Sequence, residues 1–159
     1  MWPLIALMLW TVPLAAQKGP PAPKTWPIES LSITGNRNYS EQQILAVAGL
    51  KVGQLAGPKD FEAARDRLAA SGSFESIDFR FGPGADKKGY AVSFQVVEVV
   101  PLFAVRFEDL GPPQQFEELL KRTDPLFGPR IPATQQILER YAKAIEEFLA
   151  AGNRKEKVI

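Results

Sequence analysis

The segment SITGNRNYSEQQIL, residues 32–45, changes from a strand pattern to a helix pattern within a few residues, and it constrains the fold more than any other stretch. Apolar and polar residues alternate up to its start, as in a half-buried strand. Gly35-Asn36 ends that strand, because both residue types tolerate left-handed backbone angles. Ser40 and Gln43 have the spacing of a capping box, in which each side chain bonds the backbone N–H of the other residue. The sequence therefore predicts a strand joined to a helix by a tight loop.

Two amphipathic helices are expected between residues 40 and 72. The first ends at Gly49, and the second begins near Pro58 and ends at Gly72. The stretch between them, GLKVGQLAG, lacks the Lys-Ser/Thr of a phosphate-binding loop and does not follow a strand, so it is predicted to be a plain turn between helices. The apolar positions of the two helices are Ile44, Leu45, Ala48, Phe61, Ala64 and Leu68.

Two further strands follow the helices. FESIDFRF and YAVSFQVVEV both alternate with period two, and GPGADKKG between them has the composition of a hairpin loop. Residues 28–99 are therefore predicted to be an α+β domain of order β-α-α-β-β, with two helices packed on a three-stranded sheet. The predicted core contains Leu31, Ile33, Ile44, Leu68, Ile77, Phe79, Val92, Phe94 and Val96.

Residues 101–159 begin the same pattern again. Phe103, Val105 and Phe107 alternate as in a strand, PPQQFEELLKR is predicted to be a short helix, and a longer helix is expected from about Thr134. The helix ends AASG and AAGN correspond in the two halves. The second copy would need two more strands, so the sequence predicts tandem modules of which the second, residues 101–159, is incomplete.

The N-terminal region is predicted to direct export. Residues 1–16, MWPLIALMLWTVPLAA, form an uncharged apolar run that ends in small residues, as in a signal peptide cleaved near Ala16. The run is short for a membrane span, which needs about 20 residues; a short membrane anchor and a buried helix are the alternatives. Residues 17–27, QKGPPAPKTWP, are rich in proline and are predicted to be a stiff extended linker.

Composition excludes several kinds of chemistry. The chain has no cysteine and no histidine, which removes disulfides, thiolate nucleophiles, Cys/His zinc sites and a histidine general base. Its net charge of +1 gives no strong field to attract nucleic acid. The acidic pairs Glu117-Glu118 and Glu146-Glu147 are adjacent on helices, so their members do not face each other and are expected to be solvated. The sequence therefore predicts a protein that is not an enzyme and that uses no cofactor or metal.

The ordered elements resemble the POTRA (polypeptide-transport-associated) domain family, of the type found in the outer-membrane assembly factors BamA and TamA. The resemblance is carried by IESLSITGNRNYSEQQIL, AARDRLAASGSFESIDFRF and YAVSFQVVE. The family pattern has a Gly-Asn after the first strand, a polar residue opening the helix, a G-x-F before the second strand and a Val-Glu ending the third. These correspond here to Gly35-Asn36, Ser40, Gly72-Ser73-Phe74 and Val97-Glu98. The resemblance covers residues 28–99 well and residues 101–159 in part.

The resemblance implies a periplasmic or outer-membrane-associated module for binding and scaffolding polypeptides during outer-membrane protein assembly or secretion. The implied partners are unfolded outer-membrane or secreted polypeptides, other envelope assembly proteins and, if the chain is part of a longer protein, an outer-membrane barrel. An alternative within the family is a cell-division protein of the FtsQ kind, with an N-terminal membrane anchor. An alternative of a different class is a KH-like RNA-binding module, whose glycine loop also joins two helices.

The family's strand order also implies a binding site. It places the third strand between the first and the second, which leaves the second strand at a sheet edge with unpaired backbone groups. A client strand can add to such an edge through sequence-independent hydrogen bonds. Alternatively, the polar residues of this strand only protect the edge from aggregation. Phe74 has the opposite parity to the other apolar residues of the strand and is expected to pack under the helix–strand corner. The candidate client-binding residues are Phe74, Glu75, Ser76, Ile77, Asp78, Phe79, Arg80 and Phe81.

Overall fold

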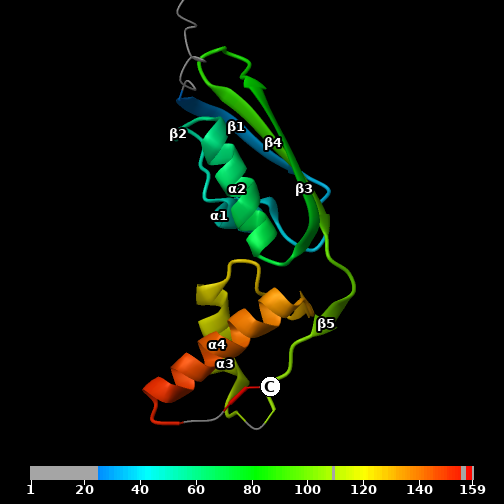
Figure 1. The fold of residues 1–159 in the computed structure, drawn as a ribbon, viewed down its shortest axis with the longest axis vertical. Helices are drawn as coiled ribbons and strands as arrows, with labels where there is room; N and C mark the ends of the chain where they lie inside the picture. The colour runs from blue at the N-terminus through cyan, green and yellow to red at the C-terminus, as the bar shows by residue number, and fades with distance from the viewer. Residues whose placement is uncertain (1–24, 109, 155–156, 159) are drawn as a thin grey trace, which may run out of the picture.

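The computed structural model describes residues 25–108, 110–154 and 157–158, and the predicted signal peptide lies outside them (Figure 1). The helices and strands of the described chain, in order, are β1 Trp26–Thr34, α1 Glu41–Ala48, β2 Leu55–Ala56, α2 Pro58–Ala70, β3 Phe74–Pro83, β4 Tyr90–Glu98, β5 Leu102–Ala104, α3 Pro113–Thr123, β6 Arg130–Pro132 and α4 Gln135–Ala151. We call β1 to β4 with α1 and α2 the first module, and β5 to α4 the second module. The predicted α+β class is confirmed.

The sheet of the first module has the order β2-β1-β4-β3. Strand β4 runs parallel to β1 and antiparallel to β3, so the predicted central position of the third strand is confirmed. The two-residue strand β2 was not predicted. It lies in the glycine-containing stretch between the helices and pairs antiparallel with the start of β1. Pro27 lies within β1, inside the predicted linker, and is tolerated there because this end of the strand pairs on one side only.

Helix α1 begins as the capping box predicts. The Ser40 hydroxyl accepts the N–H of Gln43 at 3.2 Å, and the Gln43 side chain accepts the N–H of Ser40 at 3.0 Å. Helix α2 begins with Pro58 in its first turn, and Asp60 accepts the N–H of Gly57 at 2.8 Å. The N-termini of both helices are therefore stabilised by residues close in sequence.

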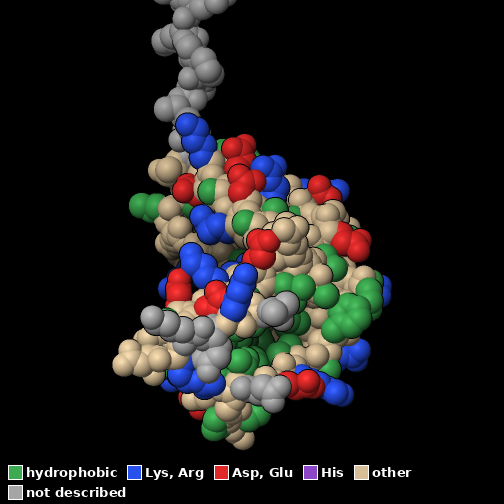
Figure 2. Space-filling model, turned by 60° about the horizontal axis from the view of Figure 1, so that its bottom comes forward, with side chains coloured by type: hydrophobic (Ala, Val, Ile, Leu, Met, Phe, Trp, Pro, Cys, Tyr) green, Lys and Arg blue, Asp and Glu red, His purple; other side chains and the backbone are tan. Residues whose placement is uncertain are grey.

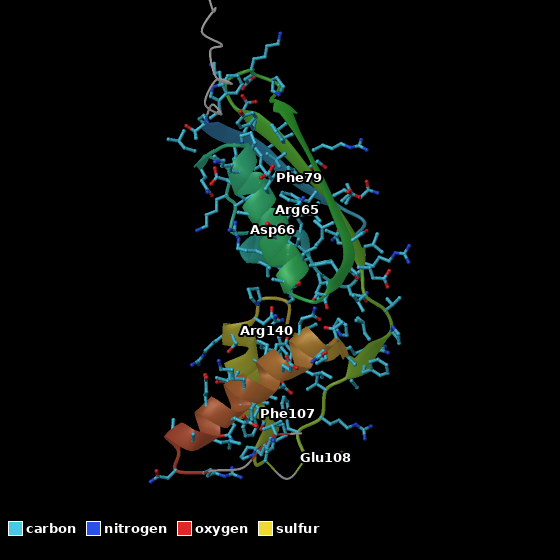
Figure 3. The ribbon with its side chains drawn as sticks, viewed as in Figure 1. Arg65, Asp66, Phe79, Phe107, Glu108 and Arg140 are labelled. Atoms are coloured by element: carbon cyan, nitrogen blue, oxygen red, sulfur yellow. The ribbon has the colours of Figure 1, made fainter. Side chains whose placement is uncertain are left out.

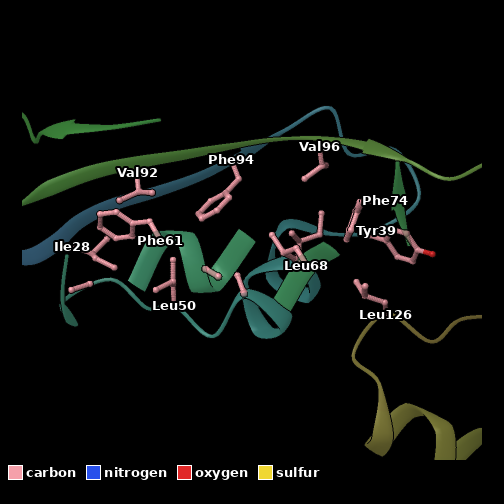
Figure 4. Packing of buried hydrophobic residues seen from close by; sticks show 14 residues of the cluster. Ile28, Tyr39, Leu50, Phe61, Leu68, Phe74, Val92, Phe94, Val96 and Leu126 are labelled. Atoms are coloured by element: carbon pink, nitrogen blue, oxygen red, sulfur yellow. The ribbon is translucent and has the colours of Figure 1, made fainter. Parts of the chain in front are cut away.

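The core of the first module lies between the two helices and one face of the sheet (Figure 4). Of the nine predicted core residues, the helix residues Ile44 and Leu68 and the three β4 residues are buried. The other four lie on β1 and β3 and are half-buried against the same cluster. Residues buried there that the core prediction did not contain are Ile28, Tyr39, Ala48, Leu50, Ala56, Phe61, Ala64, Phe74 and Leu126.

The second module repeats the order strand, helix, short strand, helix. Strand β5 covers only Leu102–Ala104, so the predicted strand through Phe107 is too long, and β6 was not predicted. As β2 does with β1, β6 pairs antiparallel with β5. A second core packs between the sheet pair and the two helices; its buried members are Phe116, Leu120, Phe127, Ile131, Ile137, Tyr141, Ile145 and Leu149.

The two modules are joined by a buried contact as well as by the chain. Leu126 follows α3 but is only 1% exposed within the core of the first module, at the end of the cluster with Tyr39 and Phe74 (Figure 4). Beside it, Arg140 of α4 donates to the Ser71 carbonyl at 3.0 Å and to the Asp124 carboxylate at 2.6 Å. These contacts fix the second module against the C-terminal end of α2 (Figures 1 and 3).

Candidate functional site

Strand β3 lies at one edge of the sheet, where it pairs with β4 and with no other strand of the described residues. Gly84 donates its N–H to the Gly89 carbonyl at 2.8 Å, which closes the hairpin, and the pairing with β4 then continues residue by residue to Ser76 opposite Val97. In an antiparallel ladder the backbone groups of successive residues point alternately toward the partner and away from it. The backbones of Ile77, Phe79 and Phe81 therefore face the open edge.

The same three residues place apolar side chains on the helix side of the sheet. Ile77 and Phe79 are half-buried, and Phe81 is 42% exposed. The Phe81 ring lies 5.1 Å from that of Phe61 and 6.2 Å from that of Phe79, between centroids. The β3 edge therefore combines open backbone groups with an accessible aromatic surface. We use "β3 edge" for the outward backbone and the side chains of Ile77, Phe79 and Phe81.

A charged pair on α2 borders the β3 edge. The Arg65 guanidinium lies 6.0 Å from the Phe79 ring centroid and 2.8 Å from an oxygen of Asp66 (Figure 3). The hydrogen bond to Asp66 raises the pKa of Arg65; a guanidinium is in any case positively charged at physiological pH. This charge therefore lies beside the aromatic surface of the β3 edge.

The polar residues of β3 point to the opposite face of the sheet. Ser76, Asp78 and Arg80 are exposed there, and their backbones turn toward β4. Their side chains flank the open edge without bonding to it in any hydrogen bond or ion pair found in the described chain. The structure therefore separates residues 76–81, six of the eight candidate residues, into an edge-forming set and a solvated polar set.

Phe74 belongs to neither set, because it points into the core. It is 7% exposed and packs edge-to-face on Tyr39, with ring centroids 5.8 Å apart. The register of β3 and β4 shifts between Phe74 and Ser76, so Glu75 is an extra residue in the ladder. Such a bulge reverses the facing of the residues before it, which explains the opposite parity of Phe74. The predicted packing of Phe74 under the helix–strand corner is confirmed.

The loop that follows β1 is bound by the carboxylate of Glu98. Glu98 accepts the backbone N–H groups of Arg37, Asn38 and Tyr39 at 2.8, 3.0 and 3.2 Å. Burial opposes the ionisation of Glu98, but these N–H groups outweigh it and hold the pKa of the carboxyl below its usual value. At Gly35, with φ at +86°, a Cβ would lie 2.1 Å from the Val96 carbonyl oxygen. Two separate parts of the sequence pattern, the Gly-Asn and the Val-Glu, therefore meet in one structural site.

The junction between the modules holds a second polar network that sequence analysis missed. Asp124, 4% exposed, accepts from Arg140, from the Tyr141 hydroxyl at 2.8 Å and from the N–H of Leu126 at 2.8 Å. Burial and the adjacent Asp124 charge raise the pKa of Tyr141, which therefore stays protonated as a donor. Because these residues are far apart in sequence and belong to no shared motif, only the fold brings them together.

The described residues offer little for other chemistry. Among residues 25–108, 110–154 and 157–158, no three Asp or Glu side chains converge in a geometry that could hold a metal ion. Within the same ranges, no helix has the length and hydropathy to cross a membrane. The arrangement at the β3 edge is suited to backbone hydrogen bonding with an extended chain.

Comparison with known proteins identifies the first module. Residues 27–99 match the family model of the POTRA domain, described as a surface antigen variable number repeat. No curated protein matches the sequence.

Several solved structures are similar to the chain, among them the following three. The N-terminal domain of Omp85 from the thermophilic cyanobacterium Thermosynechococcus elongatus is 16% identical, with a TM-score of 0.48, over 80% of this chain and 52% of that one. POTRA1-2 of the periplasmic domain of Omp85 from Anabaena is 12% identical, with a TM-score of 0.46, over 82% of this chain and 81% of that one. POTRA3-5 of BamA from Haemophilus influenzae is 15% identical, with a TM-score of 0.45, over 82% of this chain and 56% of that one. The matched part thus spans about half the length of the first of these.

Proposed function

Because residues 27–99 form a POTRA domain, we propose that the chain is a periplasmic module that binds and scaffolds polypeptides during outer-membrane protein assembly or secretion. The observation that carries the proposal is the β3 edge, where open backbone groups lie beside an aromatic surface. An extended segment of an unfolded client adds to this edge as a further strand. The family match supports this function over a KH-like RNA-binding module.

The chemistry of strand addition suits a module that accepts many sequences. The hydrogen bonds run from backbone to backbone, so they do not depend on the client's side chains. Side chains at every second client position can then contact the surface of Phe79 and Phe81, which favours apolar residues there without requiring particular ones. The open edge and the aromatic surface act together only for a chain in extended conformation.

The competing explanation is that the exposed residues Ser76, Asp78 and Arg80 merely keep the edge from aggregating. The two explanations predict different client binding when one outward-facing backbone N–H of β3 is removed. Proline at position 81 removes the outward N–H of that residue and leaves the ladder with β4 unchanged, which an edge strand tolerates. Alanine at the same position removes the aromatic ring and keeps the N–H.

The experiment compares Phe81→Pro with Phe81→Ala in the full chain. Binding of an unfolded outer-membrane protein peptide is measured by fluorescence anisotropy, and folding by circular dichroism. We expect Phe81→Pro to weaken binding about tenfold relative to Phe81→Ala, the effect of losing one hydrogen bond of about 1.4 kcal/mol. Asp78→Pro serves as a contrast, because its N–H faces β4 and its loss should destabilise the fold. Equal binding by the two position-81 variants would rule out strand addition here.

We further propose that residues 1–16 are a cleaved signal peptide that directs the module to the periplasm. The basis is the uncharged apolar run ending in small residues, followed by a proline-rich segment. N-terminal sequencing of the envelope protein should begin near Gln17. Recovery of intact Met1 in the membrane fraction would instead indicate an anchor, as in an FtsQ-like cell-division protein.

A further inference from the structure

A pocket of about 340 Å³ lies where the two modules meet, and we call it the junction pocket. Its lining comes from α1, from the C-terminal end of α2, from the end of α3 with the chain that follows it, and from α4. Ala46, Val47, Ala70 and Pro125 give the pocket apolar walls. Both modules therefore contribute to it, with residues that are far apart in the sequence.

The ionisable groups that line the junction pocket are Arg67, Arg140 and Asp124. Asp124 already uses both of its oxygens within the protein. Its Oδ2 accepts from Arg140 at 2.6 Å and from the Tyr141 hydroxyl at 2.8 Å, and its Oδ1 accepts the N–H of Leu126 at 2.8 Å. The carboxylate balances one of the two arginines, so the lining keeps an excess of positive charge.

Both arginines of the junction pocket retain hydrogen bond donors that the protein does not use. The Nε of Arg67 donates to the Ala48 carbonyl at 2.9 Å and its Nη2 donates to the same oxygen, whereas no hydrogen bond of its Nη1 is found in the described chain. Arg140 binds Ser71 and Asp124 through its Nη2, and its buried Nε has no partner among the described residues (Figure 3). Because buried donors are normally paired, these groups indicate a place for an acceptor.

The positive charge of the junction pocket is local. The whole chain has a net charge of +1, and on the face shown in Figure 2 the Lys and Arg side chains lie among Asp and Glu side chains. This face therefore has no broad positive surface that would attract anions from a distance. Binding of an anion at the pocket depends on the geometry of the two guanidinium groups.

We propose that the junction pocket binds a carboxylate on a short apolar stem, as in the glutamate side chain of an acidic peptide. An ionised carboxylate only accepts hydrogen bonds, and a guanidinium only donates them, so the two are complementary. The carboxylate accepts from the unused donors of Arg67 and Arg140, and its stem lies against the apolar walls. The site is separate from the β3 edge, and it recognises a side chain and not an extended backbone.

The test titrates the isotope-labelled full chain with a blocked tripeptide, Ala-Glu-Ala, and follows the backbone amides by NMR. Ala-Gln-Ala is the matched probe without the charge, and inorganic phosphate is a probe without the stem. Arg67→Gln removes one guanidinium that takes no part in the Asp124 network. Lys59→Gln is the matched protein control, because it removes one positive charge from an exposed position of α2 outside the pocket.

We expect Ala-Glu-Ala to shift the amides of Val47, Ser71 and Asp124 in a saturable way, and to bind Lys59→Gln as it binds the parent. Ala-Gln-Ala and phosphate should bind the parent about tenfold more weakly, as should Ala-Glu-Ala the variant Arg67→Gln. Thr123→Glu and Thr123→Gln, at the border of the pocket, give a second comparison that leaves both arginines in place. The introduced glutamate should compete for the same donors, so Thr123→Glu should bind Ala-Glu-Ala more weakly than Thr123→Gln does.

The inference is overturned if the parent shows no saturable shift at these amides, or if Ala-Gln-Ala or phosphate binds as well as Ala-Glu-Ala. It is also overturned if folded Arg67→Gln binds Ala-Glu-Ala as the parent does. Should the amide spectrum show that Arg67→Gln has lost the fold, equal binding of Ala-Glu-Ala by the two position-123 variants would overturn it instead.

Discussion

Replacing Leu126 by alanine tests whether the packing of this side chain in the core of the first module couples the stability of the two modules. Leu126 is 1% exposed and lies in the hydrophobic cluster of the first module, although it belongs to the chain between α3 and β6. A buried leucine reduced to alanine costs about 2–5 kcal/mol of unfolding free energy. Because Leu126 lies at the end of the cluster, where neighbours can partly close the space, we expect a loss near the lower limit, about 2–3 kcal/mol.

The matched control is Leu138→Ala on α4. Leu138 is 49% exposed and belongs to neither core, so its loss should stay within about 0.5 kcal/mol. Both variants are measured by urea denaturation followed by circular dichroism. Hydrogen exchange then locates the effect: Leu126→Ala should lower the protection of α1 and of the chain around Asp124 together. If Leu126→Ala behaves like Leu138→Ala, the modules are not coupled through this side chain.

Three further predictions follow from the same structure. Glu98→Gln should cost about 1–3 kcal/mol, because a charged acceptor for the Arg37, Asn38 and Tyr39 N–H groups is lost; urea titration at pH 7 measures it. The pKa of Glu98 is lowered in the folded state, so its contribution to the free energy of unfolding is fully present above its ordinary pKa of 4.5 and is lost as pH falls through the folded pKa. Over that pH range the free energy of unfolding should therefore fall more for the parent protein than for Glu98→Gln. Leu68→Ala should cost about 2–5 kcal/mol in the same assay, because Leu68 is fully buried in the first core, and a loss below about 0.5 kcal/mol would contradict that placement. The amides of residues 106–108 should exchange faster than those of β1, because β1 is paired with β4 and no described strand pairs with residues 106–108. Equal protection of the two segments would contradict this difference in pairing.

Local patterns predicted most of the first module. The spacing of Ser40 and Gln43 located the start of α1, and period-two alternation located β3 and β4, because capping and alternation depend on residues close in sequence. The short strands β2 and β6 have no such signal, since two or three residues cannot establish a period. Their pairing depends on what lies opposite them in the fold.

The sequence predicted which strand holds the candidate site, but not which residues of that strand face the open edge. Alternation alone could not show which backbones of β3 face outward, because that depends on the register with β4. The bulge at Glu75 and the resulting burial of Phe74 follow from pairing with Glu98 across the hairpin. The hydrogen bond from Arg140 to Ser71 joins residues 69 apart in the sequence, and Leu126 packs in a core made by residues of the first module. No local pattern predicts contacts between segments so far apart.

The central position of β4 also determines when the first module can form during synthesis. Strand β1 emerges first, yet its long partner is the last strand of the module, and the carboxylate of Glu98 at the end of that strand closes the loop that follows β1. Contacts between residues so distant in the chain form late and make folding slow. A chain under synthesis therefore exposes the apolar faces of α1 and α2 until residue 98 has emerged, and exposed apolar surface of this kind is prone to aggregation.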